Sequence, residues 1–299
     1  MWDVNGITFA QILAPQLLPS ALFVDRNNTV YVTGEKLSRL FEWRNSNSSL
    51  TKEFLSISFQ PFGLFVLSTG DIYISGSQNG RIDKWIRTNA TTETVVQFDQ
   101  LCNDIFISIN DMIYCSMTRN SIVATKPLHN SSNLMTVIAG VGVSGCEADM
   151  LSSPKGIFVT TNLDLYVAEE TGNRIKLFHR GEINGIEIPD RSDTFKLYKP
   201  TSVVLDANNQ IYILEQRNHR LVVKTHNGFR CLIGCAGMGH TSDRFHFPRA
   251  LAFDSYGNIF VTDSYNVRVQ KFLLLKNKCG KHHTNTAIRH FLFLFSRFK

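Results

Sequence analysis

The chain has 299 residues, of which 43% are hydrophobic and 19% charged, and its formal net charge is +6. It contains no apolar run of about 18 residues or more, which argues against a membrane-spanning helix. The segment 276–299 holds six basic residues and no acidic one, so it accounts for the whole surplus of positive charge. The bulk charge therefore does not favour nonspecific binding to a nucleic-acid backbone, which needs clustered lysine and arginine.

The first predicted element is a strand over residues 5–9, whose sequence Asn-Gly-Ile-Thr-Phe is similar to the Asn-Gly-Ile-Glu-Ile of residues 184–188. After it begins an internal repeat with about 40 to 53 residues between anchors. Each unit has a proline or its substitute, an aromatic residue twelve positions later and an arginine or its substitute eight positions further on, and only the third unit uses substitutes. The anchors are Pro19, Tyr31 and Arg39; Pro61, Tyr73 and Arg81; Cys102, Tyr114 and Ile122; Pro154, Tyr166 and Arg174; Pro200, Tyr212 and Arg220; and Pro248, Phe260 and Arg268.

Every unit predicts short strands, because β-branched and aromatic residues alternate with Asn, Asp, Gly and Thr at the turns. A fourth strand follows most units, and no helix of useful length is predicted. The clearest strands are residues 94–98, 135–139, 156–159, 165–168, 174–178, 229–233, 251–253, 258–261 and 268–272.

Four antiparallel strands per unit predict an all-β fold, a six-bladed β-propeller in which neighbouring blades bury each other's faces. The sixth unit has no convincing fourth strand of its own. We therefore expect residues 5–9 to complete the sixth blade and to close the ring. The predicted propeller covers residues 1–275, and residues 276–299 form a basic tail that is either disordered or an artefact of gene prediction.

The repeat resembles the NHL repeat, both in residues 154–175 and in the Asn-His pair at Asn218 and His219. This resemblance covers roughly residues 5–275 and implies a six-bladed NHL-type propeller, similar to extracellular invertebrate NHL-repeat proteins. Unit three is the weak match, because Cys102 replaces the proline and Ile122 replaces the arginine.

The repeated arginines have a structural interpretation. Three units also place a carboxylate three residues after the aromatic anchor, at Glu169, Glu215 and Asp263. A charge-assisted contact between neighbouring strands or blades explains both sets of residues without a sixfold repeated function. The arginines assigned to this structural role are Arg39, Arg81, Arg174, Arg220 and Arg268.

Six cysteines are present, without the paired spacings of a zinc ribbon or finger. Cys231 and Cys235 flank a turn through Gly234, and we predict a disulfide there in preference to two buried thiols. Antiparallel register places Cys115 opposite residue 105 or 106, so a bridge from Cys115 to Cys102 needs a bend in the chain. The pairing of Cys102, Cys115, Cys146 and Cys279 stays open.

Four Asn-x-Ser/Thr sequons are candidate glycosylation sites, although about three would arise by chance in such a chain. They begin at Asn27, Asn47, Asn89 and Asn130. The N-terminus lacks the apolar core of a secretory signal. The chain is then either cytoplasmic or a fragment of a longer secreted protein. The closing strand and the predicted disulfide favour the extracellular fragment.

Candidate sites for chemistry are few. The nine histidines do not recur at one repeat position, so we cannot map the histidine-held zinc of the peptide-amidating lyase, whose fold is similar. The residues after each anchor should line one mouth of the channel: Ser20, Phe62, Asn103, Lys155, Thr201 and Arg249. One is an amide and two are basic, with Asp104 as the nearest carboxylate. This set disfavours the calcium ring of lactonase-type propellers, since calcium takes oxygen ligands. We predict no catalytic residue, metal or cofactor.

The best-supported function is a noncatalytic, monomeric propeller that binds a protein, peptide or glycan through loops on one face. The loops of interest are residues 127–133 and 235–240. One alternative is a module like that of TRIM-NHL ubiquitin ligases, which would bind RNA or a ubiquitination substrate. The other is an enzymatic propeller of the peptide-amidating lyase or lactonase type.

Overall fold

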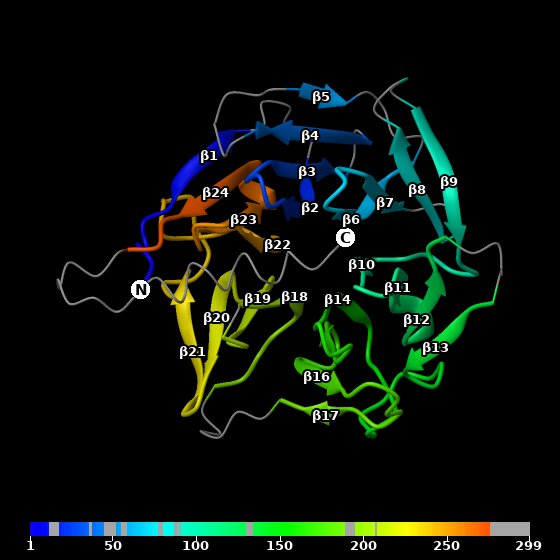
Figure 1. Cartoon of the computed structure of the whole chain (residues 1–299). Coiled ribbons are helices and arrows are strands. Elements are labelled where there is room, and N and C mark those ends of the chain that lie inside the picture. Colours follow the sequence, from blue (N-terminus) through cyan, green and yellow to red (C-terminus); the bar gives the residue numbers. More distant parts are fainter. Residues whose placement is uncertain are drawn as a thin grey trace.

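The structure is a computed structural model that describes residues 1–11, 18–35, 38–44, 52–54, 59–76, 80–86, 89, 91–129, 134–188, 195–206 and 208–275; for residues 52–54 only the backbone is considered. The described strands form six four-stranded antiparallel sheets. They surround a central axis like the blades of a propeller (Figure 1). The all-β, six-bladed fold expected from the repeat is confirmed.

Each of the first five blades is built from four consecutive strands, the first of which lies nearest the axis. Blade one has β2 (Pro19–Val24), β3 (Val30–Gly34), β4 (Arg39–Trp43) and β5 (Lys52–Phe54). Blade two has β6 (Pro61–Val66), β7 (Ile72–Gly76), β8 (Arg81–Ile86) and β9 (Thr91–Gln97). Blade three has β10 (Ile105–Ile107), β11 (Met112–Met117), β12 (Ile122–Pro127) and β13 (Thr136–Ala139).

Blade four has β14 (Pro154–Val159), β15 (Leu165–Glu169), β16 (Arg174–Phe178) and β17 (Ile186–Glu187). Blade five has β18 (Pro200–Leu205), β19 (Ile211–Glu215), β20 (Arg220–Thr225) and β21 (Gly228–Ile233). Blade six has β22 (Pro248–Phe253), β23 (Ile259–Asp263) and β24 (Arg268–Phe272), followed on its outer edge by β1 (Ile7–Gln11).

The N-terminal strand closes the ring. β1 pairs antiparallel with β24, so the expected closure is confirmed, although the strand spans residues 7–11 where residues 5–9 were predicted. Phe9 is 5% exposed, and its ring lies edge-on to Phe260 at 5.1 Å and to Trp43 at 6.0 Å. Because Phe260 belongs to blade six and Trp43 to blade one, Phe9 seals the interface at which the two ends of the chain meet.

Hydroxyl groups connect neighbouring blades near the axis. Ser75 Oγ accepts a hydrogen bond from the N–H of Gly63 in its own blade and donates to the carbonyl of Cys102 in the next. Thr262 repeats the arrangement by donating to the carbonyl of Ser20, which links blade six to blade one. The inner strands of these two blades each have a β-bulge just after the anchor proline. The hydroxyl group accepts a hydrogen bond from a backbone N–H at the bulge, which would otherwise lack a partner.

Blade three replaces its anchor proline with a disulfide. Ile105 pairs with Cys115, the register expected from the sequence. The chain ahead of β10 bends so that the N–H of Asn103 donates to the carbonyl of Ser116. This bend brings Cys102 to Cys115, and the two form a disulfide with a Cα–Cα distance of 5.2 Å. Both cysteines are fully buried, so the bridge fixes the start of the one inner strand that lacks a proline.

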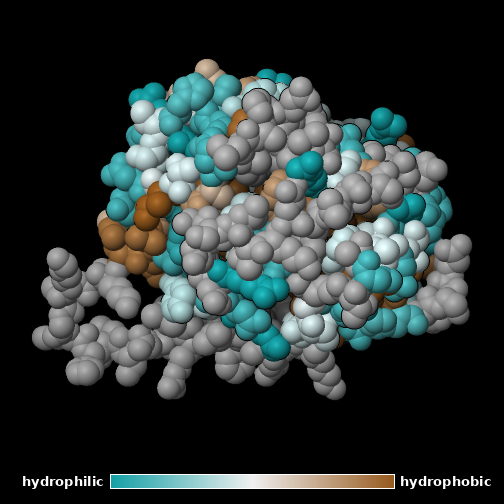
Figure 2. Space-filling view, turned by 90° about the horizontal axis from the view of Figure 1, so that it is seen from above, coloured by the Kyte–Doolittle hydropathy of each residue, from teal (hydrophilic) through white to brown (hydrophobic). Residues whose placement is uncertain are grey.

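On the face seen from above Figure 1, the coloured residues are mostly hydrophilic or of intermediate hydropathy, with a hydrophobic patch at the left of the view (Figure 2). No helix in the described part of the chain is long and apolar enough to cross a membrane.

Candidate functional site

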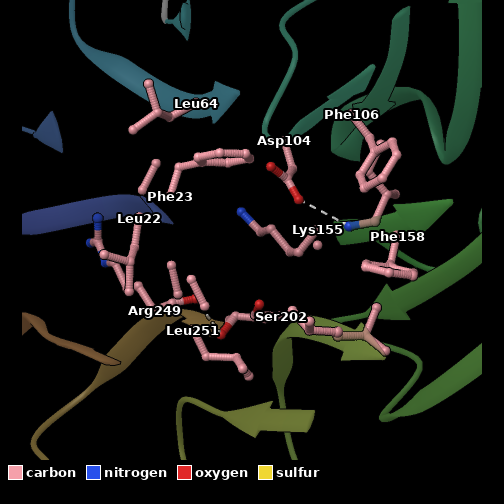
Figure 3. Close-up of a pocket in the computed structure, with 18 of the residues that line it drawn as sticks. Leu22, Phe23, Leu64, Asp104, Phe106, Lys155, Phe158, Ser202, Arg249 and Leu251 are labelled. Carbon is pink, nitrogen blue, oxygen red and sulfur yellow. Dashed lines mark hydrogen bonds between the residues drawn. The ribbon is translucent and has the colours of Figure 1, made fainter. Parts of the chain in front are cut away.

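A cavity of about 400 Å³ lies on the axis of the propeller and receives side chains from all six blades. All the inner strands run in the same direction through the ring, so the residues after their anchors meet at one end of the cavity. The six residues expected there all line it: Ser20, Phe62, Asn103, Lys155, Thr201 and Arg249. Figure 3 shows two of them, Lys155 and Arg249, among the side chains that surround the cavity. We call this end of the cavity the mouth.

The basic side chains of the mouth are paired with acidic ones. Lys155 Nζ lies 3.6 Å from Glu170 Oε2 and donates a hydrogen bond to Asn103 Oδ1 at 3.2 Å. Arg249 forms an ion pair with Glu35, which comes from blade one. Sequence reasoning missed Glu35 and Glu170, which directly follow the second strands of their blades. The Arg249–Glu35 ion pair and the Lys155–Asn103 hydrogen bond therefore join neighbouring blades at the mouth, whereas the Lys155–Glu170 pair lies within blade four.

Asp104 is the exceptional residue of the cavity. It lies two residues after the anchor Cys102. In the other five blades, the residue two positions after the anchor proline is small: Ala21, Gly63, Gly156, Ser202 and Ala250. The inner strands approach closely there, since a Cβ atom on Gly156 would lie 2.6 Å from the carbonyl oxygen of Thr201. Comparison of this repeat position across the units would have singled out Asp104 as a candidate site residue.

The Asp104 carboxylate is held by two backbone groups. It accepts hydrogen bonds from the N–H of Ile157 in the next blade, at 3.0 Å, and from its own neighbour Ile105, at 2.9 Å. Burial raises the pKa of Asp104 to about 6, although both hydrogen bonds act in the opposite direction. The carboxyl group thus changes its charge close to neutral pH.

Deeper in the cavity, the wall is aromatic over four blades. Four units place a phenylalanine four residues after the anchor. The ring centroids of Phe23 and Phe65 are 5.0 Å apart. Phe65 and Phe106 are 5.1 Å apart, and Phe106 and Phe158 are 5.4 Å apart. Blades five and six carry Val204 and Ala252 at this position, so the aromatic arc covers one side of the channel.

Three repeat arginines anchor loops on the face that carries the mouth. Arg174 pairs with Glu169, Arg220 with Glu215 and Arg268 with Asp263, each across adjacent strands of one blade. The three carboxylates are fully buried. They also accept backbone N–H groups from the loops that enter their blades, donated by Ser152, Tyr198 and His246.

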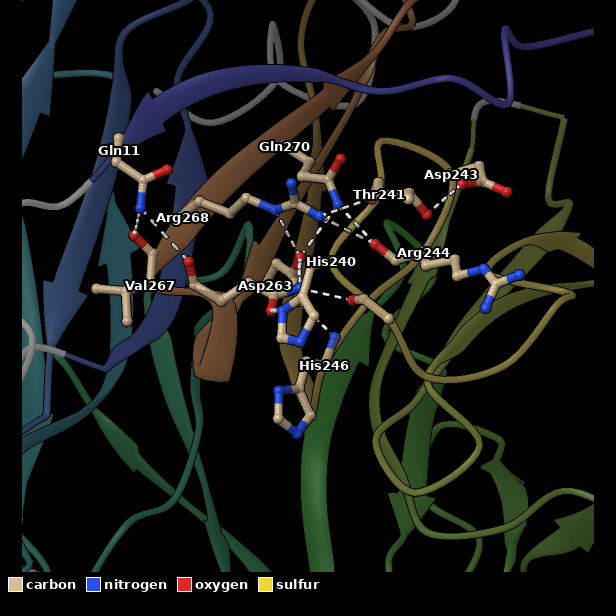
Figure 4. A network of polar contacts seen from close by, with 12 residues as sticks. Gln11, His240, Thr241, Asp243, Arg244, His246, Asp263, Val267, Arg268 and Gln270 are labelled. Carbon is tan, nitrogen blue, oxygen red and sulfur yellow. Dashed lines mark hydrogen bonds and ion pairs between the residues drawn. The ribbon is translucent and has the colours of Figure 1, made fainter.

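Figure 4 shows the sixth-blade example, in which Arg268 also donates to the carbonyls of Thr241 and Arg244. Each ion pair therefore fixes both a strand end and an entering loop. The first two blades differ, because β3 and β7 end in Gly34 and Gly76 and offer no carboxylate there. Arg81 pairs with Asp83 on its own strand, at 2.6 Å, and Arg39 is exposed.

Three histidines gather between blades five and six on this same face. The imidazole of His246 lies 5.6 Å from that of His240 and 6.0 Å from that of His219, centroid to centroid. His240 and His246 lie in the loop that enters blade six, whereas His219 comes from the turn between β19 and β20 of blade five. Burial lowers the pKa of His219, as do the neighbouring His246 and Arg217. Nowhere in the described ranges do three or more His, Cys, Asp or Glu side chains cluster suitably for a metal ion.

The remaining sequence candidates are distributed over the surface. Cys231 and Cys235 form the predicted disulfide, with a Cα–Cα distance of 5.8 Å, and Cys146 is free and exposed. The sequon asparagines Asn27 and Asn89 are exposed. Asn47, Asn130, Cys279 and the tail 276–299 lie outside the described residues, as does most of the loop 127–133 beyond His129.

A comparison with protein-family models finds a match in blade six. The NHL-repeat family model matches residues 245–272, which run from the loop before β22 to the end of β24. The chain carries an NHL repeat. The recognition of this repeat from sequence is thereby confirmed. A search of curated protein sequences finds no match.

Solved structures similar to this propeller have different activities. A catalytically inactive virginiamycin B lyase from Staphylococcus aureus with quinupristin is 15% identical, with a TM-score of 0.61, covering 92% of this chain and 100% of that one. A gluconolactonase from Xanthomonas campestris is 13% identical, with a TM-score of 0.66 and 89% of each chain covered. An auxiliary nutrient binding protein from Bacteroides thetaiotaomicron is 15% identical, with a TM-score of 0.65, covering 91% of this chain and 72% of that one. At such identities the likeness shows the shared fold alone.

Proposed function

We propose that this NHL propeller is a noncatalytic binding module that takes a peptide segment of a partner protein at the channel mouth. One observation carries the proposal: six blades direct side chains into a single cavity with a charged rim and an aromatic interior. Concave sites with apolar walls and a few fixed polar groups are the usual anatomy of ligand pockets. An apolar side chain of the peptide would enter the cavity while its backbone contacts the rim.

The rim supports binding because its geometry is set before a ligand arrives. The ion pairs Lys155–Glu170 and Arg249–Glu35 hold side chains that would otherwise be ordered on binding. Buried carboxylates fix the loops beside the mouth in blades four to six. Preorganisation of this kind lowers the entropic cost of association.

Peptide display tests this function. Peptides selected on the propeller should lose binding when Ala252→Phe fills the cavity and keep it in Tyr256→Ala. Ala252 lines the cavity at the position where four other blades carry phenylalanine, whereas Tyr256 is 62% exposed in the turn that follows the other end of β22. Binding that survives Ala252→Phe in a folded protein would refute the channel mouth as the binding site.

We also propose that residues 1–275 form one domain of a longer secreted chain. Two disulfides are typical of proteins from oxidising compartments, and the sequon asparagines Asn27 and Asn89 are accessible to glycosylation. Intact-mass analysis of the secreted product before and after reduction and deglycosylation tests this assignment. A fully reduced, unglycosylated cytosolic product would overturn it.

An enzymatic propeller is the second candidate, and Asp104 is the observation that favours it. A carboxyl group with a pKa raised to about 6 inside a cavity is suited to general acid or base catalysis. Similar structures include a lyase and a gluconolactonase. Mass spectrometry of a bound ligand distinguishes the candidates: an unchanged ligand mass after prolonged incubation fits binding, and a new product lost in Asp104→Asn fits catalysis.

A further inference from the structure

The charges of the cavity do not balance. Two ion pairs account for Lys155, Glu170, Arg249 and Glu35. Asp104 pairs with no cation among the residues that the structure describes, and its hydrogen bonds come from two backbone N–H groups. A carboxylate has about four acceptor sites, so Asp104 retains capacity for further donors. A bound cation would supply the missing charge.

The surroundings of Asp104 restrict the kind of cation. In Figure 3 its carboxylate points into the cavity, which is also bordered by Phe23, Phe106 and Phe158. Aromatic faces attract organic cations and favour apolar groups. In the described part of the chain there is no cluster of ligating side chains for a metal ion. The site therefore suits a cation that brings its own apolar body.

We propose that the channel binds a protonated organic amine, with its ammonium group on Asp104 and its apolar body against the phenylalanine arc. The proposal rests on the channel mouth being the binding site and adds the chemical class of the group that enters it. A lysine side chain or N-terminal amine of a peptide supplies this chemistry, as does a free aralkylamine.

Lys155 determines the orientation of the ligand. Its ammonium group is committed to Glu170 and Asn103 at the mouth, whereas Asp104 lies next to Ile105 at the start of the inner strand. The ligand's ammonium would sit on the Asp104 side and away from the like charge of Lys155. An anionic ligand would be attracted to Lys155 and Arg249 and would displace their carboxylate partners.

Calorimetry with three small probes of one shape tests the proposal. Phenethylammonium carries the positive charge, 2-phenylethanol is its neutral counterpart, and 3-phenylpropionate carries a negative charge. We expect phenethylammonium to bind about tenfold more tightly than the other two, in line with a hydrogen bond to a charged acceptor. Equal affinities, tighter binding of the anion, or no binding of any probe would overturn the proposal.

Variants locate the charge that recognises the amine. Asp104→Asn should reduce the affinity for phenethylammonium to that for 2-phenylethanol. Asp111→Asn should leave it unchanged, because Asp111 is an exposed carboxylate in the turn at the opposite end of β10 and does not line the cavity. Lys155→Met should raise the affinity, because it removes a like charge, and it serves as the informative variant if Asp104→Asn does not fold. A lower affinity in folded Lys155→Met, or an unchanged one in folded Asp104→Asn, would contradict the assignment.

Competition separates the two sources of the amine. Displacement of phenethylammonium by a lysine-containing peptide, and not by its Nζ-acetylated form, supports a peptide ligand; displacement by neither supports a free amine. If display-selected peptides bind at the mouth but the three probes show no preference for the cation, the amine proposal fails and the binding function stands. If no peptide binds and the amine does, the peptide function fails alone.

Discussion

Removal of Glu215 should destabilise the propeller strongly, because this carboxylate satisfies three donors at once. It is fully buried and accepts hydrogen bonds from Tyr198 N at 2.6 Å and from Asn218 Nδ2 at 2.8 Å, besides its ion pair with Arg220. In Glu215→Ala these donors lose their acceptor, and the guanidinium loses its counterion.

The size of the effect follows from burial. Breaking a buried ion pair by removing one partner costs about 3 to 5 kcal/mol. The Arg220 side chain is 21% exposed, so water can partly solvate it, and we expect the low end, about 3 kcal/mol. For a domain of this size that loss corresponds to a decrease in Tm of about 6 to 12 °C.

Guanidinium denaturation and thermal melting of three variants measure this effect. Glu187→Ala is the matched control, because Glu187 lies 3.7 Å from Arg174 but is 58% exposed, and we expect its stability to match the wild type. Glu215→Ala/Arg220→Met should recover part of the loss, since it removes the unpaired charge as well. If Glu215→Ala has the same Tm as the control Glu187→Ala, the repeat arginines and their carboxylates do not hold the ring together.

Three further predictions concern closure, blade three and the cavity. Phe9→Ala should cost about 3 kcal/mol in chemical denaturation, because Phe9 fills the interface between blades one and six, and wild-type stability would contradict closure by β1. Cys102→Ser/Cys115→Ser should lower the free energy of unfolding by about 3 kcal/mol, as expected for a loop of this length, and a variant as stable as the wild type would show that the bridge does not anchor blade three. Because the pKa of Asp104 is raised, the folded state binds the proton of this carboxyl group more tightly than the unfolded state does. The free energy of unfolding of the wild type should therefore increase relative to that of Asp104→Asn as the pH falls from 7 to 4. A difference between the two proteins that is constant with pH would refute the raised pKa.

Much of the fold is readable from the sequence because the repeat marks equivalent positions. The prolines begin the inner strands in five blades, and the predicted strands at 174–178 and 268–272 match β16 and β24 to the residue. The closing strand was identified from its likeness to residues 184–188, although only Ile186–Glu187 of that segment is a strand.

The candidate site was harder to predict because it depends on contacts between blades. The residue after each anchor was expected at the mouth, and the strand direction brings all six together. Glu35 is hard to predict because its pairing with Arg249 joins blade one to blade six and requires the ring to be assembled. Glu170 pairs with Lys155 within blade four, where the antiparallel pairing of β14 and β15 brings the two residues together. The sequence alone does not predict the Cys102–Cys115 bridge, because strand register separates the two residues and only the bend at Asn103 brings them together.

Hydrogen–deuterium exchange with and without a display-selected peptide tests most directly the claim that this propeller binds its partner at the channel mouth. We expect the peptide to slow exchange at the starts of β14, β18 and β22 and in the loop 234–247. The turns at the opposite ends of the inner strands, residues 25–29 and 254–258, should exchange as in the free protein. Protection confined to those turns, or to the outer strands, would contradict the account.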